Sequence, residues 1–450
     1  MTDVSDNPHA ARLGRAIADG SAVVAIIGLG YVGLPLALAF AGKGTRVLGV
    51  DIDAGKVATI TDGRSYFRHI PSERVGAEVA AGRLAATGDF ARLAEADAIL
   101  LCVPTPLTAH REPDMSYIVA TTEAVARHLR PGQLVVLESS TYPGTTDEVM
   151  RPILERGGLV SGRDFFLAFS PEREDPGNER FDTAAIPKIV GGDGADALAL
   201  ACRLYERAVA VTVPVSSTRT AEAVKLLENI FRAVNIALVN ELKVIYGAMG
   251  VDVWEVIEAA KSKPFGFMPF YPGPGLGGHC IPIDPFYLTW KAREHEIATR
   301  LIELAGEINT AMPRHVVERL AEALSDRAGK ALNGARVLIL GMAYKKNVDD
   351  TRESPALKLL ELLEERGAAV DFHDPFVAEI PPTRKFPELK GRRSIALDRA
   401  ALAAADAVLI ATDHDGVDYA LVAEAARLVV DTRNAMASRL GSLPANVVKA

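Results

Sequence analysis

The chain has 450 residues, of which 49% are apolar and 24% charged, and its formal net charge is −8. One hydrophobic core does not grow to this length, so two or three domains are expected, in a composition typical of a soluble enzyme. The acidic balance leaves no basic excess to neutralise a phosphate backbone, which argues against nucleic acid as a partner. Three widely separated cysteines, without a CxxC pair or metal-ligand spacing, predict free thiols, no bound metal and a cytoplasmic location.

An uncharged stretch, residues 22–40, would be long enough as a helix to cross a bilayer. Three glycines and Pro35 interrupt it, and the residues before it show neither a compact basic region nor a small-residue cleavage site. We therefore expect no membrane segment and no export signal. Residues 1–20 are interpreted as a polar extension, partly disordered or helical.

The same stretch fits a dinucleotide-binding unit better. The β-branched run Val23–Ile27 leads directly into Gly28-Leu29-Gly30-Tyr31-Val32-Gly33, and a second predicted strand ends at Asp51. In such a unit Gly28 permits the turn, Gly30 lets the backbone approach a pyrophosphate, and Gly33 allows close packing of helix on strand. An acid at Asp51 suits a free ribose 2′-hydroxyl and favours NAD over NADP. The alternative is a glycine turn in some other strand–helix–strand unit.

Polar loops follow two further predicted strands. The strand at residues 98–103 runs into Thr105, and the strand at 134–138 runs into Ser140 and Thr141. Because ligands bind beyond the carboxyl ends of the strands in an open parallel sheet, we expect these three hydroxyls near the cofactor. Each could instead be a turn-forming hydroxyl.

The middle of the chain is helical and carries candidate polar side chains. Apolar residues recur at helical spacing over residues 220–249, which places Lys225 and Asn229 on one face of a long helix. They could line a polar pocket, although a lysine on a long helix is more often solvated. Upstream, an apolar run ends just before Glu172, which puts a carboxylate at another strand end.

A loop rich in glycine, proline and aromatic residues, 261–278, leads into Cys280. Such a loop suits a lid or a ligand wall. Cys280 precedes Asp284 by four residues, but a free cysteine is more often buried and inert, so this segment alone favours packing over catalysis.

A second α/β unit begins near residue 330. A strand at 336–340, a helix at 355–366 and a strand ending near Asp374 echo the first unit without its glycine pattern. The sequence therefore predicts an α/β fold of two Rossmann-like, doubly wound domains joined by a long central helix. A second half with a purely structural role is the alternative.

Together these residues resemble the UDP-glucose/GDP-mannose dehydrogenase family of nucleotide-sugar 6-dehydrogenases, over nearly the whole chain. The motifs that carry the resemblance occur in the family's order: Gly28-Leu29-Gly30-Tyr31-Val32-Gly33-Leu34-Pro35, Val103-Pro104-Thr105-Pro106, Ser140-Thr141 with Pro143, Ser170-Pro171-Glu172, Lys225 with Asn229, Gly277-Gly278-His279-Cys280 with Asp284, and Lys345 with Asp350-Thr351-Arg352.

The resemblance implies an NAD-dependent enzyme with a nucleotide-sugar substrate, assembled as a homodimer. It divides the chain into an N-terminal extension (1–20), an NAD-binding Rossmann domain (21–215), a central helical dimerisation domain with the cysteine loop (216–329) and a C-terminal nucleotide-sugar-binding domain (330–450).

The resemblance also implies a four-electron oxidation of a sugar C6 alcohol to the uronate with two NAD per sugar. The thiolate of Cys280 would hold the intermediate aldehyde as a thiohemiacetal and then as a thioester. The catalytic residues implied are Cys280, Lys225, Asn229, Asp284, Glu172 and Thr141. The cofactor-binding residues implied are Gly28, Gly30, Tyr31, Val32, Gly33, Asp51, Lys56, Thr105, Ser140 and Arg352. The substrate-binding residues implied are Glu172, Lys225, Asn229, Tyr271, Gly277 and Lys345.

Departures from the commonest family pattern bear on the sugar. Where UDP-glucose members often carry Asp-x-Arg-Ile-Gly, this chain has the segment 262–266 without an arginine, and His279 and Ile283 replace a serine and a lysine. The chain looks more like the branch that includes UDP-N-acetylglucosamine 6-dehydrogenases. A pyrimidine nucleotide is expected, and UDP-N-acetylglucosamine, UDP-glucose and dTDP-glucose all stay open, as does use of the uronate in a polysaccharide or a glycosylated metabolite.

Two other readings compete. A two-electron hydroxyacid dehydrogenase can also use a helix lysine beside a Rossmann domain, but it leaves Cys280 and the second α/β half unexplained. A non-catalytic NAD-sensing protein needs no thiol, lysine and carboxylates in these motifs. NADH yield per sugar nucleotide separates all three.

Overall fold

The structure is a computed structural model that describes residues 6–108, 110–173, 185–278, 281–383 and 385–450. The chain forms two compact units, Met1–Glu228 with Phe286–Ile297 and Asn229–Pro285 with Ala298–Ala450. Helices α8, Thr218–Ala248, and α10, Asp284–Arg293, each contribute residues to both units.

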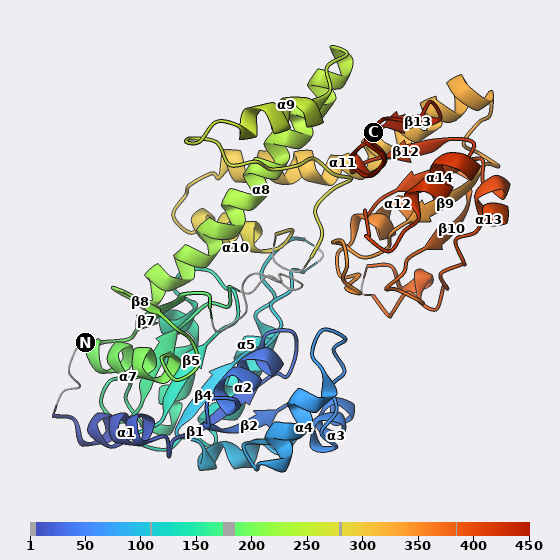
Figure 1. The fold of residues 1–450 in the computed structure, drawn as a ribbon. Coiled ribbons are helices and arrows are strands. Elements are labelled where there is room, and N and C mark those ends of the chain that lie inside the picture. Colours follow the sequence, from blue (N-terminus) through green and yellow to red (C-terminus); the bar gives the residue numbers. More distant parts are fainter. Residues whose placement is uncertain (1–5, 109, 174–184, 279–280, 384) are drawn as a thin grey trace. The chain divides into compact units, whose positions relative to one another are not determined.

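The first unit is built on an eight-stranded sheet in the order β3-β2-β1-β4-β5-β6-β7-β8 (Figure 1). All neighbours pair in parallel except β6 and β7, which are antiparallel. The strands are β1 Val23–Ile27, β2 Arg46–Val50, β3 Leu84–Thr87, β4 Ala98–Leu101, β5 Leu134–Leu137, β6 Phe166–Phe169, β7 Lys188–Gly192 and β8 Thr212–Val215. Strand order reverses between β1 and β4, so the loops after these strands diverge around the crevice where such sheets bind ligands.

Helices cover this sheet because its central strands are apolar on both faces, as parallel sheets require. They are α1 Pro8–Asp19, α2 Gly33–Ala41, α3 Ala54–Thr61, α4 Ser72–Ala80, α5 Ser116–Ala126, α6 Arg151–Leu154 and α7 Ala195–Tyr205. A π-helical turn, Thr145–Met150, precedes α6.

Helix α1 shows that the N-terminal segment packs into the first unit. Asn7 caps it by accepting hydrogen bonds from the backbone N–H groups of His9 and Ala10. Leu13 and Ile17 are buried in the core, and the helix lies beside α7 (Figure 1).

The uncharged stretch 22–40 forms β1, the glycine turn and most of α2. Among the helices that the structure describes, none combines the length and the apolar character needed to cross a bilayer.

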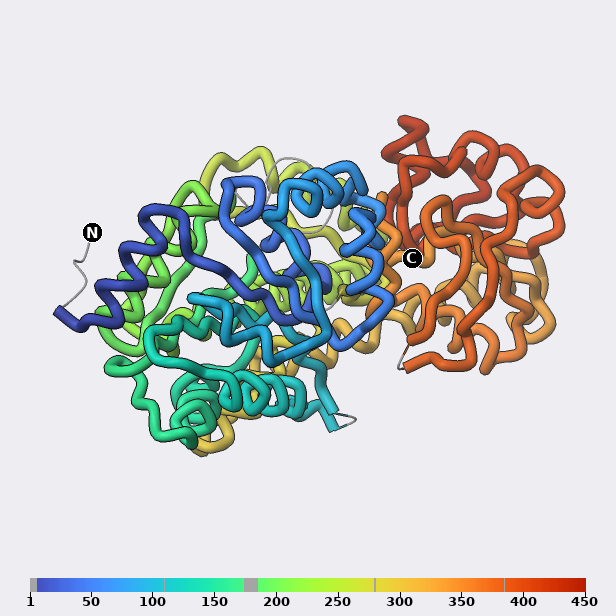
Figure 2. Tube along the Cα trace, turned by 90° about the horizontal axis from the view of Figure 1, so that it is seen from below, coloured from blue at the N-terminus to red at the C-terminus, as the bar shows by residue number. Residues whose placement is uncertain are grey.

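The second unit contains a five-stranded parallel sheet in the order β10-β9-β11-β12-β13. Its strands are β9 Arg336–Leu340, β10 Ala369–His373, β11 Ala407–Ile410, β12 Val429–Asp431 and β13 Val447–Lys449. The tube in Figure 2 shows this C-terminal part of the chain in orange and red. In its sheet, β9 comes first in sequence yet lies between β10 and β11. The predicted α/β fold, with two Rossmann-like sheets and a long central helix, is confirmed.

The remaining helices are α9 Val253–Lys261, α11 Arg300–Ala328, α12 Pro355–Glu365, α13 Arg399–Ala404, α14 Tyr419–Ala425 and α15 Ala435–Leu440. Three short 3₁₀ turns complete the elements: Phe90–Glu95, Glu155–Gly157 and Pro387–Leu389. In the second unit, the chain's own capping residues define α12, where Ser354 accepts from Ala356 N and Pro355 occupies the first turn.

Candidate functional site

The glycine turn after β1 is shaped by two close backbone contacts. A Cβ added at Gly28, whose φ is +90°, would lie 2.4 Å from the carbonyl oxygen of Cys102. A Cβ added at Gly33 would lie 1.9 Å from the carbonyl oxygen of Gly28, so α2 can start this close to the strand only without a side chain there. At Gly30 the added atom meets nothing within 4 Å. The turn is therefore packed tightly at two glycines and open at the third, which fits a pyrophosphate over Gly30.

We expect Gly33→Ala and Gly30→Ala to separate folding from cofactor binding. Because the Gly33 methyl would collide with backbone, Gly33→Ala should lower the free energy of unfolding by about 1–3 kcal/mol. The free energy of unfolding of Gly30→Ala should lie within about 1 kcal/mol of the wild-type value. The variant should nevertheless bind NADH at least about tenfold more weakly, because the methyl group enters the space of the phosphates. Urea denaturation and a fluorescence titration with NADH measure the two effects. Wild-type affinity in Gly30→Ala would show that the pyrophosphate does not lie over this glycine.

Asp51 lies at the end of β2 and is 6% exposed. Its carboxylate accepts hydrogen bonds from Leu29 N at 2.8 Å and from Asp53 N at 2.9 Å, so the acid is oriented by the glycine turn itself. The amine of Lys56 lies 3.4 Å from the same carboxylate. The structure thus pairs Lys56 with Asp51, while the prediction that it assists the phosphates is untested.

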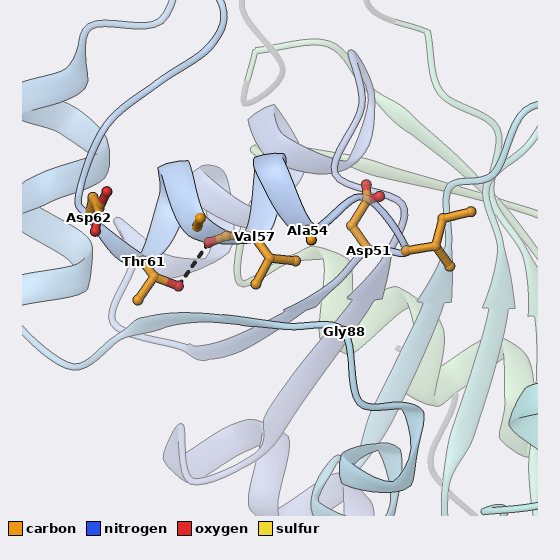
Figure 3. A pocket seen from close by; sticks show the side chains of 8 residues that line it. Asp51, Ala54, Val57, Thr61, Asp62 and Gly88 are labelled. Carbon is orange, nitrogen blue, oxygen red and sulfur yellow. Dashed lines mark hydrogen bonds between the residues drawn. The ribbon is translucent and has the colours of Figure 1, made fainter.

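A cavity of about 360 Å³ opens beside Asp51. Figure 3 shows Ala54, Val57 and Thr61 of α3 along one side of it and Gly88 opposite. The lining residues are Asp51, Ile52, Ala54, Val57, Ala58, Thr61, Asp62 and Gly88. An acid among the lining residues of a largely apolar hollow suits a ribose followed by an adenine ring, so the residues present fit NAD.

An aromatic group stands over the glycine turn. The ring of Tyr31 lies 4.4 Å from that of Phe67 and stacks on His69, and the hydroxyl of Tyr66 donates to the carbonyl oxygen of Leu29. Burial raises the pKa of the Tyr66 phenol far above its ordinary value, with Asp51 adding to the shift, so Tyr66 stays a donor. These contacts hold the glycine turn in place. Val32, by contrast, precedes α2 without a side-chain cap hydrogen bond.

The hydroxyls predicted near the cofactor follow β4 and β5. Thr105 is 4% exposed and Thr141 is fully buried, whereas Ser140 is partly exposed. Within the described part of the chain, Thr141 Oγ1 has no hydrogen-bond partner. A buried orphan hydroxyl is the kind of group that a bound water satisfies, and the water-holding role of Thr141 stays a prediction.

Glu222, one turn before Lys225 on α8, ties this loop to the helix. Its carboxylate accepts from Gly144 N at 2.6 Å, from Thr146 N at 2.9 Å and from the Thr146 hydroxyl at 2.6 Å. Burial raises the pKa of Glu222 to about 7, although the hydrogen bonds from Thr146 and Gly144 oppose that shift. The sequence motifs did not reveal this residue; only its place on a face of α8 that also carries Lys225 hinted at it.

Glu172 and Lys225 meet in the first unit. The Lys225 amine donates to the backbone carbonyl oxygen of Glu172 at 2.5 Å, and Lys225 is 8% exposed. The carboxylate of Glu172 accepts from Arg173 N at 2.7 Å and from the amine of Lys188 at 3.0 Å. Two predicted catalytic residues are therefore neighbours. Lys225 is buried, although a lysine on a long helix is more often solvated.

Behind Glu172 lies a buried polar network that sequence reasoning missed. Lys188 Nζ lies 2.6 Å from Glu138 Oε2, and the hydroxyl of Tyr205 donates to the other oxygen of Glu138. Burial alone lowers the pKa of Lys188, but the carboxylates of Glu138 and Glu172 outweigh it and raise that pKa above its ordinary value. The sequence offered two signals for this network: Glu138 directly follows an apolar strand, and Lys188 is the first residue of another.

In the second unit, Asn229 and Asp284 are in contact. Asn229 Nδ2 donates to Asp284 Oδ2 at 2.6 Å, and the two side chains are 6% and 1% exposed. Asp284 is the first residue of α10, where its charge complements the unpaired amides of the helix start. Cys280 and His279, four and five residues earlier, lie outside the described residues.

The glycines before Cys280 pack against the second α/β half. A Cβ at Gly277 would lie 2.6 Å from Tyr344 Cβ, and Gly278 N donates to the carbonyl oxygen of Arg352 at 3.2 Å. The guanidinium of Arg352 binds both oxygens of Asp350, at 2.6–3.0 Å. Arg352, predicted to assist the cofactor, is thus held inside this unit, next to the cysteine loop. Lys345, predicted to reach the substrate, lies partly exposed in the loop after β9.

Tyr271 lies apart from these groups. Its hydroxyl donates to Glu258 at 2.5 Å and its ring stacks on Trp254 at 5.7 Å, both residues of α9. Its predicted contact with substrate is untested.

The strand-end acid of the second sheet differs from Asp51. Asp374 accepts from the backbone N–H groups of Met342, Ala343, Phe376 and Val377 at 2.6–3.0 Å. His414 Nδ1 accepts from Asn347 N, so the ring proton lies on Nε2, which donates to Asp374 at 3.1 Å. Burial raises the pKa of Asp374, but the hydrogen bonds from His414 and the amides more than reverse this and hold it below its ordinary value.

The two described cysteines are poor nucleophiles. Burial raises the pKa of the Cys102 thiol, and Glu138 adds to that shift. Burial also raises the pKa of the Cys202 thiol. Both are free thiols held in the neutral form, which is the less reactive one.

Three family models match the chain in order. They describe the UDP-glucose/GDP-mannose dehydrogenase family: its NAD binding domain at residues 22–209, its central domain at 219–311 and its UDP binding domain at 338–438.

Similar proteins include a UDP-N-acetyl-D-glucosamine 6-dehydrogenase of Pseudomonas aeruginosa, 38% identical over 357 residues, which are 79% of this chain and 83% of that protein. Among solved structures, a UDP-D-ManNAc dehydrogenase of Pyrococcus horikoshii is 34% identical with a TM-score of 0.84, covering 95% of this chain and 98% of its own. A UDP-glucose dehydrogenase of Pyrobaculum islandicum is 30% identical with a TM-score of 0.82, covering 93% and 95%.

Proposed function

This chain belongs to the UDP-glucose/GDP-mannose dehydrogenase family and is an NAD-dependent nucleotide-sugar dehydrogenase, and we propose that it oxidises the C6 alcohol of a UDP-linked N-acetylhexosamine to the carboxylate. The observation that carries the proposal is the 2.6 Å hydrogen bond between Asn229 and Asp284, two predicted catalytic residues far apart in sequence, at the start of the helix that follows Cys280. The relatives from P. aeruginosa and P. horikoshii, whose names specify N-acetylated sugars, support the choice of sugar.

Four electrons would leave C6 in two oxidations, and NAD, held by the glycine turn and Asp51, would supply the hydride acceptor for each. After the first, the Cys280 thiolate adds to the aldehyde carbon, a C–S bond forms, and the oxygen takes a proton to give a thiohemiacetal. The second oxidation leaves a thioester, which water hydrolyses to the carboxylate as the C–S bond breaks and the thiol returns. The covalent bond keeps the aldehyde on the enzyme while NADH is exchanged for NAD.

The other predicted residues have tasks in this scheme. Lys225 and Asn229 stabilise the negative charge that develops on the C6 oxygen. Glu172 moves protons and Asp284 orients Asn229, as their hydrogen bonds to Lys188 and Asn229 support. Thr141 holds a water, which its partnerless buried hydroxyl in the described structure supports.

We assign NAD to residues 21–215, the nucleotide sugar to 330–450 and a homodimer contact to 216–329, in a cytoplasmic enzyme. On α8, Phe231, Leu238 and Ile245 recur every seven residues and are 47%, 50% and 45% exposed, a spacing that suits a helix packing against a second copy. A monomeric mass in light scattering would contradict the dimer.

A panel of UDP-N-acetylglucosamine, UDP-N-acetylmannosamine, UDP-glucose, dTDP-glucose and GDP-mannose tests the proposal. We expect two NADH per sugar and no released aldehyde from a UDP-N-acetylhexosamine, with kcat/KM at least about tenfold above that for UDP-glucose. A preference for UDP-glucose or dTDP-glucose would overturn the choice of sugar alone. One NADH per sugar would support the hydroxyacid-type alternative, and no NADH from any member would contradict the proposed activity.

A further inference from the structure

The antiparallel pairing of β6 and β7 brings a lysine to the ligand-binding edge of the first sheet. Because β7 runs against β6, its first residue, Lys188, lies at the edge where β5 and β6 end. Phe169 pairs with Gly191, and the same register carried three residues further sets Glu172 opposite Lys188. The Lys188 amine meets the Glu172 carboxylate there, at 3.0 Å. Ligands bind beyond this edge in sheets of this kind, so the contact lies where chemistry is expected.

A second carboxylate, directly after β5, holds the same amine from the interior. Glu138 Oε2 lies 2.6 Å from Lys188 Nζ, and the other oxygen of Glu138 accepts from the hydroxyl of Tyr205. The side chains of Lys188 and Glu138 are 4% and 0% exposed, whereas that of Glu172 is 13% exposed. Burial opposes a charged Lys188, but the two carboxylates outweigh it and raise the pKa of Lys188, so the amine stays protonated.

Other charged and titratable groups of the described chain that face this contact are engaged elsewhere or neutral. The Lys225 amine donates to the backbone carbonyl oxygen of Glu172. The guanidinium of Arg173 binds Glu228 of α8 at 2.5 Å. Burial raises the pKa of the Cys102 thiol, which keeps it neutral. Lys188, by contrast, binds the carboxylate of Glu172 itself.

The arrangement fixes both the orientation and the charge of Glu172. One oxygen accepts from Lys188 and the other from Arg173 N at 2.7 Å, so donors orient the carboxylate from two sides. Donated hydrogen bonds and a nearby cation favour the ionised form, which can accept a proton and has none to give. A buried ion pair contributes little more to stability than apolar side chains of similar volume, so stability alone does not account for a charged network at this edge.

We propose that Lys188, anchored on Glu138, is a positioning residue that keeps the Glu172 carboxylate ionised and oriented as a proton acceptor in the reaction. This inference rests on the proposed function, in which water hydrolyses a thioester. In that step the water oxygen bonds to C6, a water proton passes to Glu172, and the C–S bond breaks as the thiolate leaves with its electron pair. The proton then passes to the thiolate, and Glu172 is ionised again.

The pH dependence of kcat in three full-length proteins tests the proposal: wild type, Glu138→Gln, and Glu138→Gln combined with Lys188→Met. Each is assayed with the preferred nucleotide sugar of the panel, and its folding is checked by circular dichroism. The Glu138→Gln background is chosen because Lys188→Met alone strands two carboxylates, one of them fully buried.

The two variants should move the acid limb of the kcat profile in opposite directions. Glu138→Gln removes a like charge near Glu172, so the limb should move to lower pH, with the plateau of kcat within about threefold of wild type. Removing Lys188 as well takes away the cation, so the limb should move to higher pH than in Glu138→Gln. At pH 7, kcat should then be about tenfold to hundredfold lower, while KM for the sugar nucleotide and Kd for NADH stay unchanged.

Lys291→Met is the matched control. Its amine is also buried, at 8% exposure, and lies 2.7 Å from each of two carboxylates of the same unit, those of Glu148 and Glu294. Neither is a predicted catalytic residue, so kcat and its acid limb should match those of wild type.

The outcomes separate this inference from the proposed function. A folded double variant whose acid limb coincides with that of Glu138→Gln would show that Lys188 serves the fold alone, and the proposed function would stand. If the double variant does not fold, Glu138→Gln decides: a limb at lower pH supports the inference, and an unmoved limb overturns it. If wild type reduces no NAD with any sugar of the panel, the proposed function fails and the inference fails with it.

Discussion

Cys280→Ala should abolish uronate formation while NAD binding persists. Without the thiolate, the aldehyde is not held for a second oxidation, so NADH yield should fall from two to at most one per sugar, and the rate of uronate formation by on the order of 10³ or more. NADH absorbance with mass spectrometry of the sugar product measures both. The reason to single out this thiol is physical as well as positional, since burial raises the pKa of the other two thiols.

Cys202→Ala is the control for Cys280→Ala. Cys202 lies on α7 and is partly exposed. Its substitution removes the same thiol group without changing any predicted catalytic residue. It should keep two NADH per sugar. Uronate produced at the wild-type rate by Cys280→Ala would rule out the covalent route.

Lys188→Met should strongly destabilise the first unit. The variant leaves the carboxylates of Glu138 and Glu172 facing each other without their shared cation, and Lys188 and Glu138 are 3% and 1% exposed. Removing one member of a buried ion pair costs about 3–5 kcal/mol, far more than the pair itself contributes. Urea denaturation at pH 7, followed by circular dichroism, measures the loss.

Two comparisons check the cause. Adding Glu138→Gln to Lys188→Met should recover part of the lost stability, because one of the two stranded charges is then gone. Lys261→Met, which breaks an exposed pair with Glu258, should leave the free energy of unfolding nearly unchanged. Equal effects of Lys188→Met and Lys261→Met would mean that water reaches the Glu138 side chain in the folded protein.

Local patterns predicted much of the first half because they determine it. The glycine turn and β1 follow from short-range sterics and β-branched side chains, and the strand starts at Val23 and ends at Ile27 as predicted. The long helix, predicted at 220–249, begins at Thr218 and ends at Ala248. The short strands β3, β7, β8 and β13 were not predicted. Each has only three to five residues, and β3, β8 and β13 are edge strands, so pairing with neighbours rather than local preference makes them strands.

The candidate site was less predictable, because its contacts join distant segments. Nothing near Asn229 in sequence indicates that it binds Asp284, and the helix pattern alone favoured a solvated Lys225. The resemblance supplied the residues but not their pairing. Lys188 was missed for a related reason. A charged residue at the start of an apolar strand is expected at the surface, and only the position of β7 in the sheet shows that Lys188 is buried.

Asp374 uses its whole carboxylate for hydrogen bonds within the second unit. The amides of Met342 and Ala343 follow β9 and donate to this carboxylate, much as the amide of Leu29 donates to Asp51 in the first unit. Asp374 also accepts from Phe376 N, Val377 N and His414, so its lone pairs are taken and none is left for the hydroxyls of a cofactor ribose. Restoring a glycine pattern after β9 would therefore not by itself create a second dinucleotide site.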